Sequence, residues 1–312
     1  MNWPNGFKRL IPAAYTPFHD DGTLHLDAIP ALADLYRAGG IDATFIGGTT
    51  GEFASMTTEE RLLLAEGWMA AARDDIQVLV HAGHTCQQDA VRIAAHAREI
   101  GAAGVSALAP YYFVAQGPEA LAAFLEPVAR AADPVPFYYY EIPSMTGFRH
   151  APDRVFELLL ERIPNFAGLK YSSPDLVRFQ RCRPAAGADL DRYFGSDEML
   201  LAAVAVGATG AIGSTYNYSA PLYARMLSAY AAGETNEARR LQRTSVDLVD
   251  VLVRFGGLSA GKALMALLGA PCGPVRPPLR PLAHAETRAL YEALSGFEGF
   301  IRPLQFPAGY LP

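Results

Sequence analysis

The sequence of 312 residues has few of the features that mark secreted, metal-binding or membrane proteins. Its three cysteines, Cys86, Cys182 and Cys272, are far apart and odd in number, which indicates neither a disulfide framework nor a zinc site. No stretch approaches the ~18 uninterrupted apolar residues of a membrane helix, and residues 1–10 have no long apolar targeting segment. These absences predict a protein of the reducing, cytoplasmic compartment.

Positive charge is also sparse. The net charge is −6, the isoelectric point is near 5.7, and no long run of lysine and arginine occurs, so neither a nucleic acid nor an acidic membrane is an expected partner. With 51% hydrophobic and 19% charged residues, the chain can bury a large core, as one barrel-sized domain or as two smaller ones. A small-molecule substrate is therefore the expected partner.

Two motifs that would announce a cofactor or a metal are missing. The first predicted strand is not followed by the G-x-G-x-x-G fingerprint of dinucleotide-binding folds. The seven histidines form no H-x-x-x-H or H-E-x-x-H pattern, and the acidic residues lack metal-site spacing. We therefore expect neither a cofactor nor a metal.

What is present is a regular alternation of apolar, strand-like runs with segments of helical period. The predicted strands are Leu10–Tyr15, Ala43–Gly47, Ile76–His81, Gly104–Ala109, Pro136–Ile142, the run from Phe166 that ends at Lys170, Arg192–Gly195, and Gly210–Ser214. The predicted helices are Leu26–Ala38, a helix capped by Thr57 with Glu60, Gln87–Ile100, Pro118–Ala131, Asp153–Arg162, a helix from about Asp197, and Ala220–Ala231. Eight such units within roughly 250 residues predict a closed (β/α)₈ TIM barrel rather than an open doubly wound sheet.

The alternation stops after Gly233. The predicted helices here are Glu234–Phe255, Ser259–Leu268 and His284–Leu294, which are separated by the pair Gly256-Gly257 and by a proline-rich segment. We expect residues 1–232 to form the barrel that carries the active site and residues 233–312 to form a C-terminal helical appendix with a tail. The tail from Gly296 contains several aromatic residues without a period, so it is expected to pack as an extended arm or to be disordered.

Lys170 is the residue around which the rest of the site is interpreted. It ends a short apolar run just before Pro174, which predicts a place at the C-terminal edge of the sheet, where barrel enzymes carry their chemistry. A buried ammonium is costly unless it becomes the neutral amine or an imine, and the neutral amine attacks carbonyl groups. The alternative is a strand-end lysine that extends its amine into solvent.

Other strand ends supply polar groups that could serve the same site. Thr49, Thr50 and Glu52 lie in a glycine-bracketed loop that either binds a carboxylate or is only a tight turn. Tyr140 is the last of three consecutive tyrosines, of which alternate ones must point into the barrel, and each is alternatively a core aromatic. A lysine, a phenol and hydroxyl donors suffice for imine chemistry, in which the phenol moves a proton while a carbon–carbon bond breaks.

The last two strands add acids and hydroxyls. The candidates are Gly195, Asp197 and Glu198 after strand seven, with Ser214, Tyr216 and Asn217 after strand eight, and Ser172 beside the lysine. The two acids have a simpler interpretation, because carboxylates favour the first turn of a helix. His81 and His84, at the end of strand three, are weaker candidates for lining the pocket.

Five motifs in this order resemble the N-acetylneuraminate lyase and dihydrodipicolinate synthase family of pyruvate-dependent class I aldolases. They are Gly48–Glu52, Ala109–Tyr112, Tyr140–Gly147, Gly168–Lys170 and Gly207–Ser214, and the resemblance covers nearly the whole chain. It implies that Lys170 forms a Schiff base with pyruvate, that Tyr140 relays the proton and that Thr49 and Thr50 bind the pyruvate carboxylate. It also implies that Tyr112 reaches the site of a neighbouring subunit, in a homotetramer.

Within the family, one position separates two branches. Dihydrodipicolinate synthases usually carry, in this motif, an arginine that binds the second substrate's carboxylate, and here the position holds Met145. The neuraminate lyase branch is similar to this chain in the residues that contact the sugar's polyol chain. By that resemblance they are Ser172, Gly195, Asp197, Glu198 and Ser214.

The resemblance thus implies an aldolase that cleaves N-acetylneuraminate to N-acetylmannosamine and pyruvate. One alternative is another pyruvate-dependent aldolase or dehydratase that acts on a different 2-keto sugar acid or 4-hydroxy-2-oxo acid. The other is a protein that binds without turnover.

Overall fold

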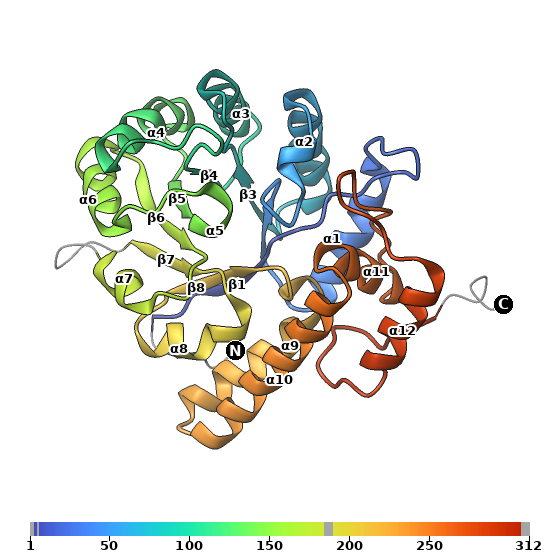
Figure 1. The fold of residues 1–312 in the computed structure, drawn as a ribbon. Coiled ribbons are helices and arrows are strands. Elements are labelled where there is room, and N and C mark those ends of the chain that lie inside the picture. The colour runs from blue at the N-terminus through green and yellow to red at the C-terminus, as the bar shows by residue number, and fades with distance from the viewer. Residues whose placement is uncertain (1–2, 5, 184–189, 307–312) are drawn as a thin grey trace.

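The structure is a computed structural model that describes residues 3–4, 6–183 and 190–306. Eight parallel strands form a ring that is surrounded by helices (Figure 1). The strands are β1 (Arg9–Pro12), β2 (Ala43–Ile46), β3 (Gln77–His81), β4 (Gly104–Leu108), β5 (Phe137–Glu141), β6 (Phe166–Tyr171), β7 (Asp191–Phe194) and β8 (Gly210–Gly213).

The helices alternate with the strands and continue after the last one. They are α1 (Ile29–Ala38), α2 (Thr58–Ala72), α3 (Gln87–Glu99), α4 (Pro118–Ala132), α5 (Pro143–Thr146), α6 (Pro152–Arg162), α7 (Leu176–Arg181), α8 (Leu200–Ala205), α9 (Tyr216–Ala231), α10 (Thr235–Arg254), α11 (Leu258–Leu267) and α12 (His284–Leu294). Short 3₁₀ turns are η1 (Leu26–Ala28), η2 (Phe53–Ser55) and η3 (Asp197–Met199). No helix of the described chain is both long and apolar enough to span a membrane.

The sheet closes on itself. Each strand pairs in parallel with its sequence neighbour from β2 to β8, and β8 also pairs with β1. The remaining gap is bridged where Ala13 pairs with Phe45, and the Ala14 N–H donates to the Phe45 carbonyl at 2.9 Å. The predicted (β/α)₈ TIM barrel is therefore confirmed.

Local sequence explains why these elements form. Every residue of β2, β4, β5 and β8 is buried, as expected for parallel strands that are covered on both faces. Helix α2 begins with the predicted capping box: the Thr57 hydroxyl accepts from the Glu60 N–H at 3.2 Å, and the Glu60 carboxylate accepts from the Thr57 N–H at 2.9 Å. The burial of these strands and the start of α2 therefore follow from the local sequence.

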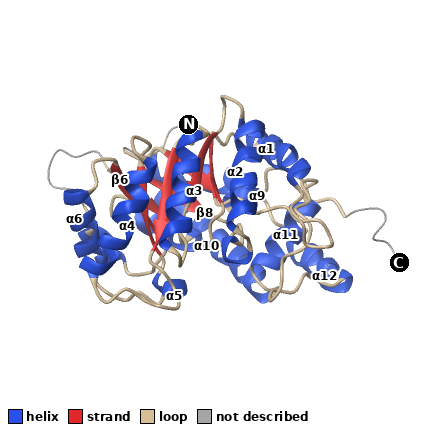
Figure 2. Cartoon of the chain, turned by 90° about the horizontal axis from the view of Figure 1, so that it is seen from above, coloured by secondary structure: helices blue, strands red, loops and turns tan. Residues whose placement is uncertain are grey.

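The C-terminal helices lie beside the barrel. Figure 2 shows α11 and α12 on the side away from α4 and α6. The tail packs back as an arm: the Ile301 N–H donates to the Tyr218 carbonyl at 2.8 Å, and the Gln305 N–H donates to the Leu267 carbonyl at 2.7 Å. The packed alternative for the tail is thus confirmed as far as residue 306, whereas Tyr310 lies outside the described residues.

Three details differ from the sequence-based expectation. Strand β1 ends at Pro12 rather than Tyr15, and beyond it Ala13 forms only an isolated bridge to Phe45. Helix α9 begins at Tyr216 and bends at Ser219, so the expected start at Ala220 marks only its second part. Two short helices, α5 after β5 and α7 after β6, were not predicted, since four and six residues are too few to show a period.

Candidate active site

Lys170 lies in β6 with its side chain inside the barrel, near the C-terminal ends of the strands. It is 4% exposed, which contradicts the alternative of a lysine extended into solvent. Its amine donates to the Ser172 hydroxyl at 3.2 Å and sits 3.6 Å from the centre of the Tyr140 ring. The amine therefore contacts a hydroxyl and an aromatic face, which are neutral partners.

Tyr140 is the direct neighbour of Lys170, because the two residues pair in register across β5 and β6. Burial by itself raises the pKa of the Tyr140 phenol. The positive charge of Lys170 and interactions with Lys170, Thr49 and Ser172 outweigh burial, so the pKa of the phenol lies below its usual value. A phenol of lowered pKa next to an amine is suited to proton transfer near neutral pH.

Thr49 connects the loop after β2 to this pair. Its hydroxyl lies 3.3 Å from the Tyr140 hydroxyl, and Thr50, the next residue, is 8% exposed. The Thr16 hydroxyl donates to the Gly51 carbonyl at 2.6 Å, which fixes the middle of the loop. A pocket of about 220 Å³ opens beside Thr49, and its wall includes Leu108, Tyr111, Met145 and Leu258.

Ser172 and Gly195 fit against each other between β6 and β7. A side chain on Gly195 would begin 2.1 Å from the Ser172 oxygen, so only glycine leaves room for that hydroxyl. The Gly195 N–H donates to the Tyr171 carbonyl at 2.8 Å and holds the strand end in place. The structure therefore brings Lys170, Tyr140, Thr49, Ser172 and Gly195 together.

Asp197 begins the turn after β7 and is 4% exposed. One of its oxygens accepts from the Thr215 N–H at 2.8 Å and from the Thr215 hydroxyl at 2.6 Å, and the Tyr216 hydroxyl also interacts with this carboxylate. Burial raises the pKa of Asp197 to about 6, although the bonds from Thr215 oppose the shift. A side chain on Gly213 would begin 1.6 Å from Oδ1, so glycine at the end of β8 makes room for this carboxylate.

The remaining candidates lie on the same end of the barrel but without a contact to Lys170. Glu198 and Ser214 are partly exposed, directly after β7 and β8. Tyr112 lies in the loop after β4, is 86% exposed and has a φ of 72°, so it is not part of the site formed by its own chain. The expectation that Tyr112 reaches a neighbouring subunit remains a prediction.

Two aromatic neighbours of the lysine were not singled out from the sequence, or only weakly. The Phe45 ring lies 5.5 Å from the Lys170 amine. In the sequence, Phe45 resembles the other apolar residues of a buried strand, so nothing there distinguished it. The His81 ring lies 5.6 Å from the Tyr140 ring and is fully buried. Burial, together with the charges of Arg61 and Lys170, holds the pKa of His81 well below its usual value, so its imidazole is neutral.

The sequence contains a Gly-x-Ser-x-Gly pattern at residues 257–261, which is typical of the nucleophile turn of serine hydrolases. In hydrolases this motif is a sharp turn between a strand and a helix. Here it opens α11 without a preceding strand, and the Ser259 hydroxyl donates to the Arg280 carbonyl at 2.7 Å. Ser259 is therefore not a nucleophile of that kind.

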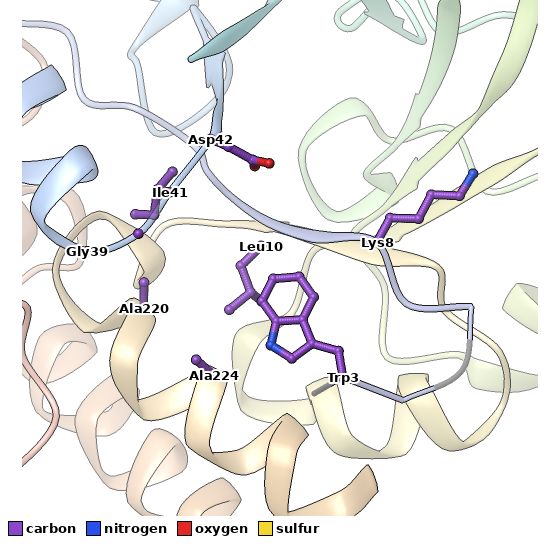
Figure 3. Close-up of a pocket in the computed structure, with 9 residues that line it drawn as sticks. Trp3, Lys8, Leu10, Gly39, Ile41, Asp42, Ala220 and Ala224 are labelled. Carbon is purple, nitrogen blue, oxygen red and sulfur yellow. The ribbon is translucent and has the colours of Figure 1, made fainter. Parts of the chain in front are cut away.

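The described residues show no metal cluster, and a further pocket lies at the other end of the barrel. The described residues contain no group of three or more histidine, cysteine or acidic side chains that could hold a metal. A pocket of about 280 Å³ lies at the opposite, N-terminal end of the strands, where Trp3, Lys8 and Asp42 line it (Figure 3). This pocket is therefore at the opposite end of the barrel from Lys170.

Comparison with known proteins matches the same regions. The model of the dihydrodipicolinate synthetase family matches residues 6–296. The chain is 36% identical to rat (Rattus norvegicus) N-acetylneuraminate lyase over 302 residues, which cover 95% of this chain and 92% of the relative. It is 37% identical to the human (Homo sapiens) N-acetylneuraminate lyase over 288 residues, covering 89% and 88%.

Solved structures agree. The N-acetylneuraminate lyase of Proteus mirabilis superposes with a TM-score of 0.89 at 32% identity, over 93% of this chain and 98% of that one. A match of this extent, in fold and in sequence together, leaves the family in no doubt. The chain belongs to the dihydrodipicolinate synthetase family.

Proposed function

We propose that this protein is a class I, Schiff-base-forming aldolase that cleaves N-acetylneuraminate to N-acetylmannosamine and pyruvate. The observation that carries the proposal is the buried Lys170 amine, 3.6 Å from the Tyr140 ring and free of a carboxylate partner among the described residues. The similarity to N-acetylneuraminate lyases over most of the chain supports this substrate.

The chemistry follows from the positions of the two side chains. The Lys170 amine adds to the C2 ketone of the open-chain sugar acid, water leaves, and the protonated imine that forms withdraws electrons from the C3–C4 bond. Tyr140 accepts the proton of the C4 hydroxyl as that bond breaks, which releases the aldehyde sugar and leaves an enamine. The enamine takes a proton at C3, and water then hydrolyses the imine to release pyruvate and the amine.

Substrate binding is assigned to the surrounding hydroxyls and acids. We place the carboxylate of the keto acid at Thr49 and Thr50, because that loop ends next to Tyr140. The polyol chain would then run past Ser172 toward Gly195, Asp197, Glu198 and Ser214 on the ends of β6 to β8. The carboxylates of Asp197 and Glu198 support this direction, since a polyol needs several hydrogen-bond acceptors at fixed positions.

Met145 favours the lyase over the synthase. It is 63% exposed at the mouth of the pocket and cannot bind a carboxylate, so the second acidic substrate of a synthase has no partner there.

The assembly and the compartment are part of the proposal. We infer a homotetramer in which Tyr112 enters a neighbour's site, and the exposure of Tyr112 at 86% and Phe113 at 85% supports a partner surface there. We place the protein in the cytoplasm, which agrees with three cysteines that are all free.

The test is pyruvate release from a panel of sugar acids, with N-acetylneuraminate and 2-keto-3-deoxygluconate assayed side by side. We expect a higher kcat/KM for N-acetylneuraminate. A clear preference for the shorter sugar acid would assign the protein to another aldolase of the family, and no release from any member of the panel would contradict turnover altogether.

A further inference from the structure

Glu52 and Lys262 form an ion pair that is sealed inside the protein. The Lys262 amine lies 2.8 Å from one carboxylate oxygen of Glu52, and the two side chains are only 2% and 1% exposed. The amine also donates to the Pro274 carbonyl at 2.7 Å, and the second Glu52 oxygen accepts from the Arg276 N–H at 2.8 Å. A buried pair of this kind is tolerated when further hydrogen bonds support it, and the Pro274 carbonyl and the Arg276 N–H supply two of them here.

Glu52 is also the last residue of the loop that carries Thr49 and Thr50. Its backbone has a φ of 56°, a left-handed conformation that is unfavourable for a residue with a side chain. Its N–H donates to the Thr49 carbonyl at 3.1 Å. Contacts of the Glu52 side chain therefore hold a strained turn, and that turn places the Thr49 hydroxyl against Tyr140.

The residues that grip Glu52 come from the part of the chain after the barrel. Arg276 donates to both carboxylate oxygens of Glu60, to the Gly22 carbonyl and to the Ser55 carbonyl, and it stacks 4.1 Å from the Phe18 ring. Its segment is thus fixed to α2 and to the residues on either side of the loop. Lys262 extends from α11, so two separate C-terminal elements converge on one carboxylate.

We propose that Glu52, Lys262 and Arg276 form a clamp that positions Thr49 and Thr50 for the carboxylate of the keto acid, a role that rests on the proposed function. The clamp acts through geometry and charge together. It fixes the turn, and it neutralises an anion that would otherwise repel a substrate carboxylate bound two or three residues away. Glu52 and Lys262 are positioning residues, because neither is required to touch the substrate.

The experiment compares Glu52→Gln, Lys262→Met and the double variant with wild type and with Lys8→Met, a lysine control at the far end of the barrel. Borohydride traps the imine on Lys170, and mass spectrometry of the lysine peptides gives the concentration of ketone needed for half-maximal trapping. Pyruvate is compared with pyruvamide, which has the same ketone but no carboxylate. Thermal unfolding is measured on every variant.

We expect both single variants to need up to about 100-fold more pyruvate, since small displacements near a reacting centre have effects of that size. Pyruvamide should change much less, and Lys8→Met should behave as wild type. The double variant removes both charges, so its melting temperature should be higher than that of Lys262→Met. Its pyruvate concentration for half-maximal trapping should remain as high as in the single variants.

Two results would overturn the clamp alone. One is a lowered melting temperature with an unchanged demand for pyruvate, and the other is an equal loss for pyruvate and pyruvamide. Wild-type protein that traps no pyruvate would instead overturn the proposed function, and the clamp with it.

Discussion

The sequence contains only three lysines, and two of them are buried in contrasting surroundings. Lys170 and Lys262 are 4% and 3% exposed, whereas Lys8 forms a partly exposed ion pair with Asp191 at 2.9 Å. Lys262 has the carboxylate of Glu52 beside its amine, and Lys170 forms no ion pair within the described chain. The two lysines are therefore equally buried, but only Lys262 has a carboxylate partner.

The difference shows what separates a structural lysine from a reactive one. Burial lowers the pKa of the Lys262 amine, but the Glu52 carboxylate favours the charged form, and an ammonium held in this way has no lone pair to offer. The Lys170 amine contacts only a hydroxyl and aromatic rings, with no carboxylate beside it among the described residues. A neutral setting keeps an amine available for attack on a ketone.

The largest expected effect comes from replacing each lysine by methionine. Lys170→Met should lower turnover by roughly 10⁴-fold or more, as removal of a nucleophile does. Lys262→Met should lose on the order of 3–5 kcal/mol of stability, because it leaves Glu52 buried without its cation, yet should still form the imine at saturating pyruvate. Borohydride trapping followed by peptide mass analysis checks both, and a pyruvate adduct on Lys262 would reverse the assignment of the two roles.

A smaller loss is expected when the phenol beside Lys170 is removed. Tyr140→Phe keeps the ring that faces the amine but removes the group that moves the proton, so kcat should fall by roughly 10²–10⁴-fold. Pyruvate trapping on Lys170 should persist in part, since the amine is intact. Tyr139→Phe is a control on the same strand, with its hydroxyl on the Glu141 side. Normal turnover by Tyr140→Phe would assign the proton to another group.

The contrast between the lysines also marks how far the sequence predicts the structure. Lys170 was predictable because a charged residue ended an apolar run at a strand end, and this local signal survives folding. Its neighbours Tyr140 and Thr49 followed from their own strand ends, since a parallel barrel brings all such ends together. The helix bounds were less certain where a bend or a short element left no period, as in α7 and α9.

The pairing of Glu52 with Lys262 was not predicted, because the two residues lie on elements that are far apart in sequence. A signal was present: Lys262 is the only charged residue of the otherwise apolar helix α11. A lone charge on a buried helix indicates that a partner exists, but its identity depends on how α11 packs against the barrel. The packing reason for glycine at 213 is similar, since it arises only from the Asp197 carboxylate that approaches it, whereas Gly195 was a candidate from its motif alone.

Glu141 extends the comparison to a buried acid that lacks a cation. It is 3% exposed, accepts a hydrogen bond from the Tyr139 hydroxyl and forms no ion pair with a described residue. Burial raises the pKa of Glu141 to about 7, despite the opposing effects of Tyr139 and Arg178. Its folded pKa thus lies above the unfolded one, so the stability linked to this group is complete at low pH and is lost as pH rises toward and through 7.

Glu141→Gln should remove that part of the pH dependence, because an amide does not ionise and its oxygen can still accept from Tyr139. The free energy of unfolding of wild type should fall relative to the variant by on the order of 2–3 kcal/mol between pH 4.5 and pH 8. Urea unfolding at the two pH values measures this difference, with Glu161→Gln on the exposed face of α6 as the matched control. If the difference in unfolding free energy between wild type and variant stays constant with pH, the pKa of Glu141 is not raised. Glu141 would then have a positively charged partner, as Glu52 does.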